Sequence, residues 1–338
     1  MHFLIIGVGS IGERHLRNFL RIDGVKCSIA EPNAGMREKA VAQYKVEQAY
    51  ADYRKADLRS FDGAVICVPA NWHIPIATDV VTAGIHVLLE KPLAMMLDGV
   101  AELKRRRDEK GVVVSVAYTL RSDPLFREIA ELGRSGELGT VRVVNSYAGQ
   151  YWPRMRKDYP PAYAQKRETG GGAIPDHLIH YMNFLEWMFG PPLDVAARQF
   201  KLGLPDVATE DTAFVTLRFG GGQIAQLGLC LFQRDTNSRM QMIADAGTVQ
   251  LTHESPALSI FMDQAGQWTQ GRARQAQRDD VFRDQALHFI ECIRGKATPR
   301  CTVEQAEQTL LTMLAALRSS DTDGGFVKVE RAGAAKIP

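Results

Sequence analysis

The sequence predicts an α/β protein in which a doubly wound parallel sheet is followed by an α+β domain with a mostly antiparallel sheet. In the first part of the 338 residues, short apolar runs alternate with helical patterns, which indicates a parallel sheet. A glycine-rich stretch over residues 7–12 follows the first of these runs. Beyond residue 120, strand-like runs lie close together with tight glycine turns, and this favours antiparallel pairing.

The stretch Gly7-Val8-Gly9-Ser10-Ile11-Gly12 lies between a buried strand pattern at 3–6 and a helical pattern. A strand-to-helix turn is the context that the dinucleotide-binding Rossmann fingerprint requires. Gly7 permits the tight turn, Gly9 lets a pyrophosphate approach the backbone, and Gly12 lets the helix pack close to the strand. The helix N-terminus at Ser10 and Ile11 offers N–H groups and a partial positive charge to the phosphates.

The next strand pattern, at 25–30, ends in Glu31, which lies 19 residues after Gly12. This is close to the expected position of the acid that binds the adenosine ribose. The carboxylate would accept hydrogen bonds from the ribose hydroxyls and repel a 2′-phosphate, so the sequence predicts NAD rather than NADP. The alternative is an ordinary tight turn followed by an acid at a strand end. The register of strand, glycines, helix, strand and acid favours the cofactor site.

The composition is that of a globular protein. Hydrophobic residues make up 45% and charged residues 24%, and a net charge of +2 gives no reason to expect a nucleic-acid or membrane partner. The five cysteines are odd in number and form no CxxC, so we expect neither a disulfide framework nor a metal site. The chain enters a strand at once and has no apolar run of membrane-spanning length, so we expect a cytoplasmic protein without a signal peptide.

The other elements follow from the same patterns. In the first part, strands are expected at 46–50, 62–69, 86–89 and 112–117, and helices at 36–44, 74–83 and 97–109. In the second part, strands are expected at 140–147, 212–219, 222–232, 239–244 and 248–252, and helices at 124–132, 176–189, 280–294 and 303–318. We therefore expect a cofactor domain over residues 1–120 and a second domain over 121–338, whose terminal helix packs back on the first.

Lys91, Asp176 and His180 are the candidate catalytic residues. Lys91 follows a predicted strand at its carboxyl end, where open α/β sheets bind ligands. Asp176 and His180 are spaced i, i+4, so they share one helix face, and Gly170-Gly171-Gly172 before them would let the backbone pass close to a ligand. His180 could take a hydroxyl proton, Lys91 could stabilise charge on the same oxygen, and Asp176 could orient the histidine or a sugar hydroxyl. Taken alone, His180 would also suit an ordinary helix histidine.

These motifs, in this order, resemble the glucose–fructose oxidoreductase and inositol dehydrogenase family (Gfo/Idh/MocA) over essentially the whole chain. The resemblance rests on the fingerprint at 7–12, on Glu90-Lys91-Pro92, and on the triple glycine with Asp176 and His180. It implies that these three candidates are catalytic and that the second domain binds substrate and oligomerises. It also implies that the following residues lie near the cofactor: Pro69, Asn71, His73, Glu90 and Lys91.

The sequence departs from the family pattern at two positions. Leu178 stands where many members have glycine, and Asn183 stands where many have an acid. The Asp-x-Leu-Ile-His form resembles members that act in surface-sugar or nonulosonate pathways. Asn183 puts in doubt a substrate contact known from polyol dehydrogenases, but it leaves the hydride chemistry intact.

Basic and aromatic residues are interleaved between Tyr151 and Thr169. A sugar that carries a carboxylate or phosphate would suit such a lining, and a solvated basic loop is an equal alternative. The candidate substrate residues are Arg121, Trp152, Arg156, Tyr163, Lys166 and His177.

In the strands at 212–232, apolar residues fall on both alternations, as in Phe214-Val215 and Leu227-Leu229-Leu231. A sheet face without helices would then need a partner, so we expect a homo-oligomer, dimer or tetramer, built on that face.

The sequence therefore predicts an NAD-dependent dehydrogenase or reductase that transfers a hydride between nicotinamide and a secondary alcohol or ketone. The expected substrate is a small sugar, polyol or sugar derivative, which an anionic group would suit. A redox-neutral glycosidase or eliminase that recycles bound NAD is a second hypothesis. A non-catalytic NAD-binding regulator is a third, and the presence of all three candidate catalytic residues argues against it.

Overall fold

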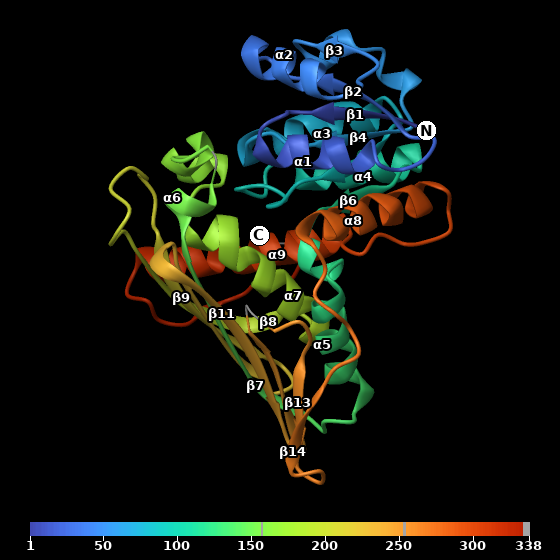
Figure 1. Ribbon diagram of the computed structural model, residues 1–338. Coiled ribbons are helices and arrows are strands. Elements are labelled where there is room, and N and C mark those ends of the chain that lie inside the picture. Colours follow the sequence, from blue (N-terminus) through green and yellow to red (C-terminus); the bar gives the residue numbers. More distant parts are fainter. Residues whose placement is uncertain (157, 253–254, 334–338) are drawn as a thin grey trace. The chain divides into compact units, whose positions relative to one another are not determined.

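The computed structural model describes residues 1–156, 158–252 and 255–333 (Figure 1). The chain folds as two compact units, the first formed by Met1–Ser122 with Gln277–Glu307 and the second by Asp123–Ala276 with Gln308–Pro338. The sequence analysis placed the boundary at residue 120 and assigned Gln277–Glu307 to the second domain. The structure places this segment in the first unit because its apolar side chains complete the core there.

The first unit contains a six-stranded sheet in the order β3-β2-β1-β4-β5-β6 (Figure 1). All its strands pair in parallel, which confirms the predicted doubly wound sheet. The strands are β1 (His2–Ile6), β2 (Lys26–Ala30), β3 (Ala49–Tyr50), β4 (Gly63–Ile66), β5 (His86–Leu89) and β6 (Val114–Val116). The strand order reverses between β1 and β4, and ligands bind at the carboxyl ends of strands beside such a reversal.

Two helices pack against one face of this sheet. Phe19 of α1 and Phe289 of α8 both contact Phe3 of β1. The centroid of the Phe3 ring lies 4.8 Å from that of Phe19 and 6.2 Å from that of Phe289. Burying each such side chain stabilises the fold by roughly 1.5–3 kcal/mol. At the surface, Arg17 donates two hydrogen bonds to Asp279, which fixes α1 beside α8. The helices of this unit are α1 (Ser10–Phe19), α2 (Ala34–Gln43), α3 (His73–Thr82), α4 (Val100–Lys110) and α8 (Arg278–Ile293).

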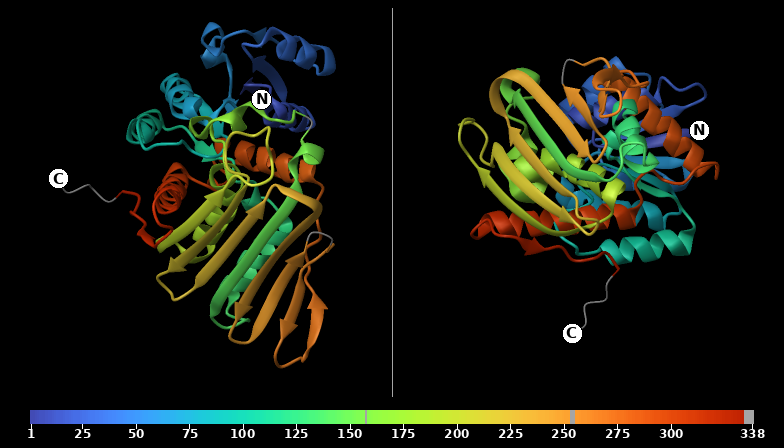
Figure 2. Two further views of the ribbon diagram at one scale, coloured as in Figure 1. Left: turned by 90° about the vertical axis from the view of Figure 1, so that its left-hand side faces the viewer. Right: turned by 90° about the horizontal axis from the view of Figure 1, so that it is seen from below.

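The second unit contains a nine-stranded sheet in the order β14-β13-β12-β11-β7-β10-β9-β8-β15 (Figure 2). Its neighbours pair antiparallel except for β7 and β10, so the predicted mostly antiparallel sheet is confirmed. The strands are β7 (Val141–Tyr151), β8 (Pro192–Phe200), β9 (Thr212–Phe219), β10 (Ile224–Cys230), β11 (Phe232–Ala244), β12 (Gly247–Thr252), β13 (Ser259–Met262), β14 (Gln267–Gln270) and β15 (Val327–Lys328).

Helices cover one face of the second sheet. Phe126 of α5 packs edge-on against Phe184 of α7, with ring centroids 5.0 Å apart, and Ser319 of α9 accepts the N–H of Ala197 in β8. The apolar side chains of β9 and β10 that point to this face are buried: Ala213, Val215, Leu217, Leu227 and Leu229. The helices are α5 (Pro124–Ser135), α6 (Trp152–Met155), α7 (Ile179–Phe189) and most of α9 (Val303–Asp321).

The opposite face of the second sheet carries a mixture of polar and apolar side chains. Phe214 and Ile224 are 51% and 41% exposed there, Phe214 opposite Gly228 and Ile224 opposite Arg218 in the pairing of β9 with β10. The expected apolar residues on both alternations are therefore only partly present, because Leu227, Leu229 and Leu231 are all buried. Over the described residues, none of the helices has the length and apolarity needed to cross a bilayer.

Candidate functional site

Gly7 and Gly12 are required by the fold of the first unit itself. Gly7 has φ +86°, and a Cβ there would lie 2.7 Å from the carbonyl oxygen of Cys67 in the neighbouring strand connection. A Cβ on Gly12 would lie 1.9 Å from the carbonyl oxygen of Gly7. The first glycine therefore forms the turn and the second lets α1 approach β1, as the sequence analysis expected.

Gly9 differs, because the packing of the protein does not require a glycine there. Its φ is −62°, and the nearest atom to an added Cβ would be the terminal methyl of Met36, 3.9 Å away. In the described structure, Gly9 begins α1 without a side-chain cap, and Ser10 after it is exposed while Ile11 is half-buried. The space that a side chain would fill, beside uncapped N–H groups, fits the pyrophosphate of a dinucleotide.

Glu31 is held at the carboxyl end of β2 by two backbone amides. One carboxylate oxygen accepts the N–H of Val8 at 3.0 Å, and the other accepts the N–H of Asn33 at 2.9 Å. Only 7% of the residue is exposed. Each oxygen keeps a second lone pair, so the carboxylate could still accept hydrogen bonds from ribose hydroxyls. The contact to Val8 also ties it to the glycine turn.

In the turn after β4, two of the predicted cofactor residues are exposed and the third is buried. Pro69 and Asn71 are exposed, Pro69 directly before the short 3₁₀ helix Ala70–Trp72 and Asn71 within it. His73 is 1% exposed, and its ring nitrogens lie 2.7 Å from the Pro92 carbonyl oxygen and 2.9 Å from that of Val68. Burial lowers the pKa of His73, while the two carbonyl contacts act in the opposite direction. Its side chain thus braces the turn against the segment that carries Lys91, and Pro69 and Asn71 face outward.

A buried hydrogen bond between His15 and Glu90 supports Glu90-Lys91-Pro92 from the side of α1. His15 Nε2 lies 2.8 Å from Glu90 Oε1, and the two side chains are 1% and 6% exposed. Burial alone would raise the pKa of Glu90, but the hydrogen bond from His15 holds it below its ordinary value. The other carboxylate oxygen accepts the N–H of Lys91 at 3.1 Å, and the Lys91 side chain is half-buried. His15 was not predicted as a site residue, although a polar residue three positions after Gly12 on the buried face of a helix was a signal.

In the second unit, Asp176 lies in a π-helical turn, Ile174–Leu178, and α7 begins only at Ile179. The sequence predicted an α-helix from 176 onward, so this part of the prediction was wrong. Pro175 stands in the first turn of this helical stretch, where its missing N–H costs no hydrogen bond. π-turns inside helices occur frequently at functional sites.

The triple glycine before this turn has a structural role. Gly170 and Gly172 have φ +96° and +113°, which side chains rarely adopt. A Cβ on Gly171 would lie 2.8 Å from the carbonyl oxygens of Tyr163 and Lys166. The glycines therefore let the 163–166 segment pack against the start of the helix. The sequence analysis had assigned them to close approach of a ligand, and here the closely approaching group is the chain itself.

Asp176 is 7% exposed and is held by two candidate substrate residues. Tyr163 donates its hydroxyl hydrogen to Asp176 Oδ2 at 2.8 Å, and Arg156 Nη2 lies 3.6 Å from the same oxygen. Arg156 also donates to the Tyr163 hydroxyl at 2.9 Å. Burial, with the Asp176 charge, raises the pKa of Tyr163 well above its ordinary value. Burial would lower the pKa of Arg156, but Tyr163 and Asp176 raise it. Tyr163 therefore stays protonated and donates to the Asp176 side chain.

His177 and Trp152 join the same cluster. His177 Nδ1 lies 3.3 Å from Asp176 Oδ2. On the other side of the ring, Trp152 Nε1 and Gln150 Nε2 each lie 3.1 Å from His177 Nε2. Trp152 is 2% exposed, and the Arg156 guanidinium lies 5.4 Å from its ring centroid, in a cation–π contact. Four of the six candidate substrate residues are thus brought together around Asp176.

His180 and Asn183 follow in α7 with different environments. His180, its second residue, is half-buried. Asn183 is fully buried and donates to the hydroxyl of Thr309 in α9 at 2.9 Å. The departure from the family pattern at Asn183 therefore lies inside the packing of two helices.

Arg121 and Lys166 do not join the Asp176 cluster. Arg121 is 2% exposed in the first unit and donates to Gln305 Oε1 at 2.6 Å, as a structural residue would. Lys166 is exposed, and its carbonyl oxygen accepts the N–H of Gly171 at 3.1 Å.

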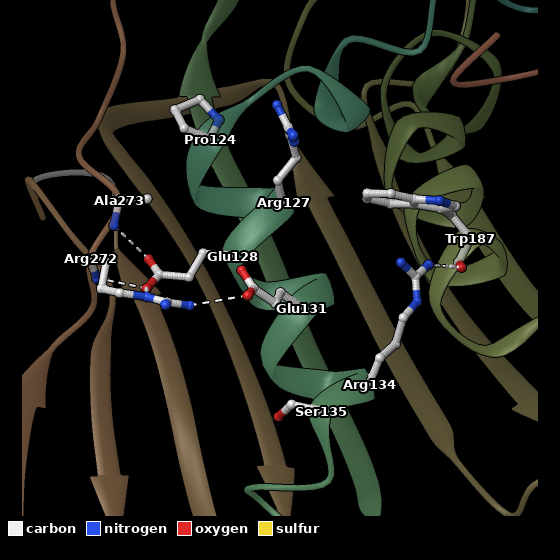
Figure 3. A pocket seen from close by; sticks show the side chains of 9 residues that line it. All are labelled: Pro124, Arg127, Glu128, Glu131, Arg134, Ser135, Trp187, Arg272 and Ala273. Atoms are coloured by element: carbon white, nitrogen blue, oxygen red, sulfur yellow. Dashed lines mark hydrogen bonds and ion pairs between the residues drawn. The ribbon is translucent and has the colours of Figure 1, made fainter. Parts of the chain in front are cut away.

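A surface groove of about 670 Å³ in the second unit is lined by none of the predicted site residues (Figure 3). Four of its charged side chains, Glu128, Glu131, Arg134 and Arg272, are bound to one another or to the backbone. Glu128 accepts the N–H groups of Arg272 and Ala273, and the Arg134 guanidinium stacks 4.5 Å from the centroid of Trp187. We interpret it as an ion-paired surface that fixes the 271–274 segment to α5. The described residues contain no group of three or more His, Cys, Asp or Glu side chains arranged to hold a metal ion.

Two family models match the chain. One, an oxidoreductase family with an NAD-binding Rossmann fold, matches residues 1–118, and the other, a GFO/IDH/MocA C-terminal domain, matches residues 126–250. The first unit is therefore an NAD-binding domain, and the uncapped start of α1 beside Gly9 is consistent with that cofactor.

Curated proteins and solved structures agree with the family models. The chain is 29% identical to an uncharacterized oxidoreductase, YrbE, of Bacillus subtilis strain 168, over 65% of this chain and 64% of that protein. It is 23% identical to the myo-inositol 2-dehydrogenase of Thermotoga maritima over 94% and 96% of the two chains. The structure superposes with a levoglucosan dehydrogenase in complex with NADH with a TM-score of 0.86, at 18% identity over 98% and 99% of the two chains.

Proposed function

Because the chain belongs to the Gfo/Idh/MocA family of oxidoreductases, we propose that it is an NAD-dependent dehydrogenase or reductase for a secondary alcohol or ketone of a sugar, polyol or sugar derivative. The observation that carries the proposal is the buried Asp176 in its π-turn, held by Tyr163 and Arg156, with His180 following in the next turn. The similarity to a curated myo-inositol dehydrogenase supports the substrate class.

The proposed roles follow from the chemistry of alcohol oxidation. NAD, when bound to the first unit, supplies the hydride acceptor. His180 accepts the hydroxyl proton, since imidazole is a base near neutral pH. Lys91 stabilises negative charge on the same oxygen. Asp176 orients its neighbours and accepts a hydrogen bond from a substrate hydroxyl.

The charge balance around Asp176 bears on the choice of substrate. Arg156 faces Asp176 and Tyr163, so one carboxylate of the protein already neutralises this guanidinium. If Arg156 bound a substrate anion instead, its charge would no longer balance that of Asp176. We therefore propose neutral polyols and sugars before uronates or phosphorylated sugars, whereas the sequence left an anionic substrate and a solvated basic loop as equal alternatives.

The test is a panel of polyols, aldoses, uronates and nucleotide sugars with NAD, followed by the absorbance of NADH at steady state. A dehydrogenase accumulates NADH in proportion to substrate consumed. An enzyme that recycles bound NAD converts substrate without net NADH, and a regulator converts none. Either of the last two results would overturn the proposal.

Cofactor choice gives a separate prediction. NAD is expected to bind at least ~10-fold more tightly than NADP, because Glu31 would face the 2′-phosphate as a like charge. Glu31→Gln is expected to reduce this preference, since the amide carries no charge and its oxygen can still accept one of the two backbone N–H groups. Fluorescence quenching with both cofactors measures the two affinities. Equal affinities in the unmodified protein would contradict the assignment of Glu31.

We also propose that the protein is a homo-oligomer built on the face of the second sheet that carries Phe214 and Ile224. Phe214→Glu is expected to lower the mass measured by light scattering, because it places a charge in a buried interface. Met96→Glu is the control, since Met96 is a 58% exposed apolar residue of the first unit. A monomer mass for the unmodified protein at micromolar concentration would refute the proposal.

A further inference from the structure

The hydroxyl group of Tyr163 has a fixed hydrogen-bond polarity. Arg156 Nη2 lies 2.9 Å from it, and a guanidinium can only donate, so the hydroxyl oxygen accepts there. The same hydroxyl lies 2.8 Å from Asp176 Oδ2 and donates its single hydrogen to that oxygen. Both contacts are hydrogen bonds of ordinary length, and they run in one direction, from Arg156 through Tyr163 to Asp176.

This polarity limits what Tyr163 could offer to a substrate. Its one hydrogen is already given to Asp176, so the hydroxyl has no donor left for a substrate oxygen. Burial and the charge of Asp176 hold the pKa of Tyr163 well above its ordinary value, although Arg156 acts in the opposite direction. The hydroxyl therefore stays protonated and does not serve as a base. Tyr163 was expected among the substrate residues, and its contacts are instead those of a residue that acts on a neighbouring carboxyl group.

The backbone of Tyr163 is held by the triple-glycine turn. Its carbonyl oxygen accepts the hydroxyl hydrogen of Thr169 at 2.6 Å, and a Cβ on Gly171 would lie 2.8 Å from the same oxygen. Because Gly171 has no side chain, the turn that leads toward Asp176 packs directly against Tyr163. The same glycine turn thus precedes the carboxyl group and holds the residue that donates to it.

The next two residues anchor this segment to a second loop. The Ala164 carbonyl oxygen accepts the hydroxyl hydrogen of Thr209 at 2.7 Å. The Gln165 side chain accepts the N–H of Ala208 at 3.1 Å and donates to the Asp206 carbonyl oxygen at 3.0 Å. The tyrosine is therefore carried by a segment whose backbone is fixed on two sides, which suits a group that must hold another side chain in one orientation.

We propose that Tyr163 is a positioning residue, which orients the Asp176 carboxyl group through a hydrogen bond whose direction Arg156 fixes. This inference rests on the proposed function, because that function gives Asp176 its part in the reaction. It also accounts for the triple glycine, which brings the backbone close enough for Tyr163 to reach Asp176. Orientation of this kind has a large effect on rate, since a misplacement of about 1 Å can cost ~10²-fold.

Tyr163→Phe removes the hydroxyl group and keeps the ring. We expect kcat/KM to fall ~10–100-fold, because Asp176 loses the donor that fixes its orientation, while NAD affinity stays unchanged. Tyr53→Phe is the matched control. Tyr53 donates to Asp79 Oδ2 at 2.6 Å in the first unit, so the same kind of hydrogen bond is lost between two residues outside the candidate site. A kcat/KM for Tyr163→Phe equal to that of the control would overturn the positioning role.

A double-mutant cycle separates action through Asp176 from a direct contact with substrate and from a loss of packing. In Asp176→Ala, no carboxyl group is left to orient, so adding Tyr163→Phe is expected to change kcat/KM by less than about two-fold. A tyrosine that contacted the substrate, or only supported the fold, would lose the same factor in both backgrounds. Equal losses in the two backgrounds would therefore contradict the inference.

A spectroscopic measurement tests the contact without relying on turnover. Carbon NMR spectra of the full chain labelled with ¹³Cζ-tyrosine report the ionisation of each tyrosine, and the Tyr163→Phe spectrum identifies the Tyr163 signal. At pH 10, where an unperturbed tyrosine is about half ionised, we expect Tyr163 to remain protonated. Its pKa should fall in Asp176→Asn, which removes the neighbouring charge. A Tyr163 pKa that did not respond to this substitution would show that the two side chains are not in contact, and the inference would be lost.

The kinetic and spectroscopic measurements also separate this inference from the proposed function. If the substrate panel shows no NADH while the pKa of Tyr163 responds to Asp176→Asn, the proposed function has failed and the contact between the two side chains has not. If the chain oxidises a polyol and Tyr163→Phe keeps its full kcat/KM, the function stands and the positioning role is lost.

Discussion

His180→Ala is expected to lower kcat by ~10²–10⁴-fold, because it removes the base that accepts the hydroxyl proton. NAD affinity should barely change, since His180 lies in α7 of the second unit and the dinucleotide fingerprint belongs to the first. Steady-state kinetics with the best substrate of the panel, together with fluorescence titration of NAD, give both quantities. Turnover near that of the unmodified enzyme would remove His180 from the mechanism.

Two further variants calibrate that result. Lys91→Ala should lower kcat by ~10²–10³-fold, because its charge stabilises the oxygen mainly in the transition state. Asp176→Asn should cost less, because the amide oxygen can still accept the hydrogen bond from Tyr163. If Asp176→Asn were the most damaging of the three, the negative charge of Asp176 and not its orientation would be the important property.

The sequence was sufficient for the first sheet because β1, β4, β5 and β6 are almost entirely buried. Such strands read as continuous apolar runs, and each is followed by a helix. In the second sheet, β8, β13, β14 and β15 were missed. All four residues of β14 are exposed, so no alternation marks it, and β15 has only two residues. β14 and β15 lie at the two edges of the sheet. They form because neighbouring strands pair with them, and a pairing partner is not visible in a local sequence pattern.

The candidate site shows the same limit at the level of single residues. The spacing of Asp176 and His180 was visible in the sequence, and so was the cluster of basic and aromatic residues before them. Their connection was not, because Arg156 meets Asp176 only through the fold of a loop 20 residues upstream. The sequence could not show that this arginine is neutralised by the protein's own carboxylate. Because Asp176 neutralises Arg156, neutral sugars and polyols are proposed before anionic ones.

Glycine is the residue type whose meaning changed most between sequence and structure. Adjacent glycines at 170–172 and spaced glycines at 7–12 both suggested approach of a ligand. Steric contacts separate them: a Cβ on Gly171 would strike backbone atoms at 2.8 Å, whereas a Cβ on Gly9 would meet nothing closer than 3.9 Å. Only a glycine that the protein's own packing does not require indicates space kept for another molecule.

This difference leads to a prediction for two alanine variants of the fingerprint. Gly9→Ala is expected to leave the melting temperature unchanged, since its Cβ has room, yet to weaken NAD binding ~10–100-fold. The methyl group would occupy the space of the pyrophosphate, and each lost charge-assisted hydrogen bond costs about 1.5–3 kcal/mol. Gly12→Ala is expected to weaken NAD binding at least as much and also to destabilise the protein by about 1–3 kcal/mol, because its Cβ would lie 1.9 Å from the Gly7 carbonyl oxygen.

Thermal unfolding without cofactor and NAD titration by fluorescence separate the two variants. Gly220→Ala is the control, because the nearest atom to its Cβ is 4.0 Å away and it lies in the second unit. The cofactor assignment requires Gly9→Ala to lose binding without losing stability. If Gly9→Ala bound NAD like the unmodified protein, the pyrophosphate would not lie against Gly9, and the space beside the start of α1 would need another explanation.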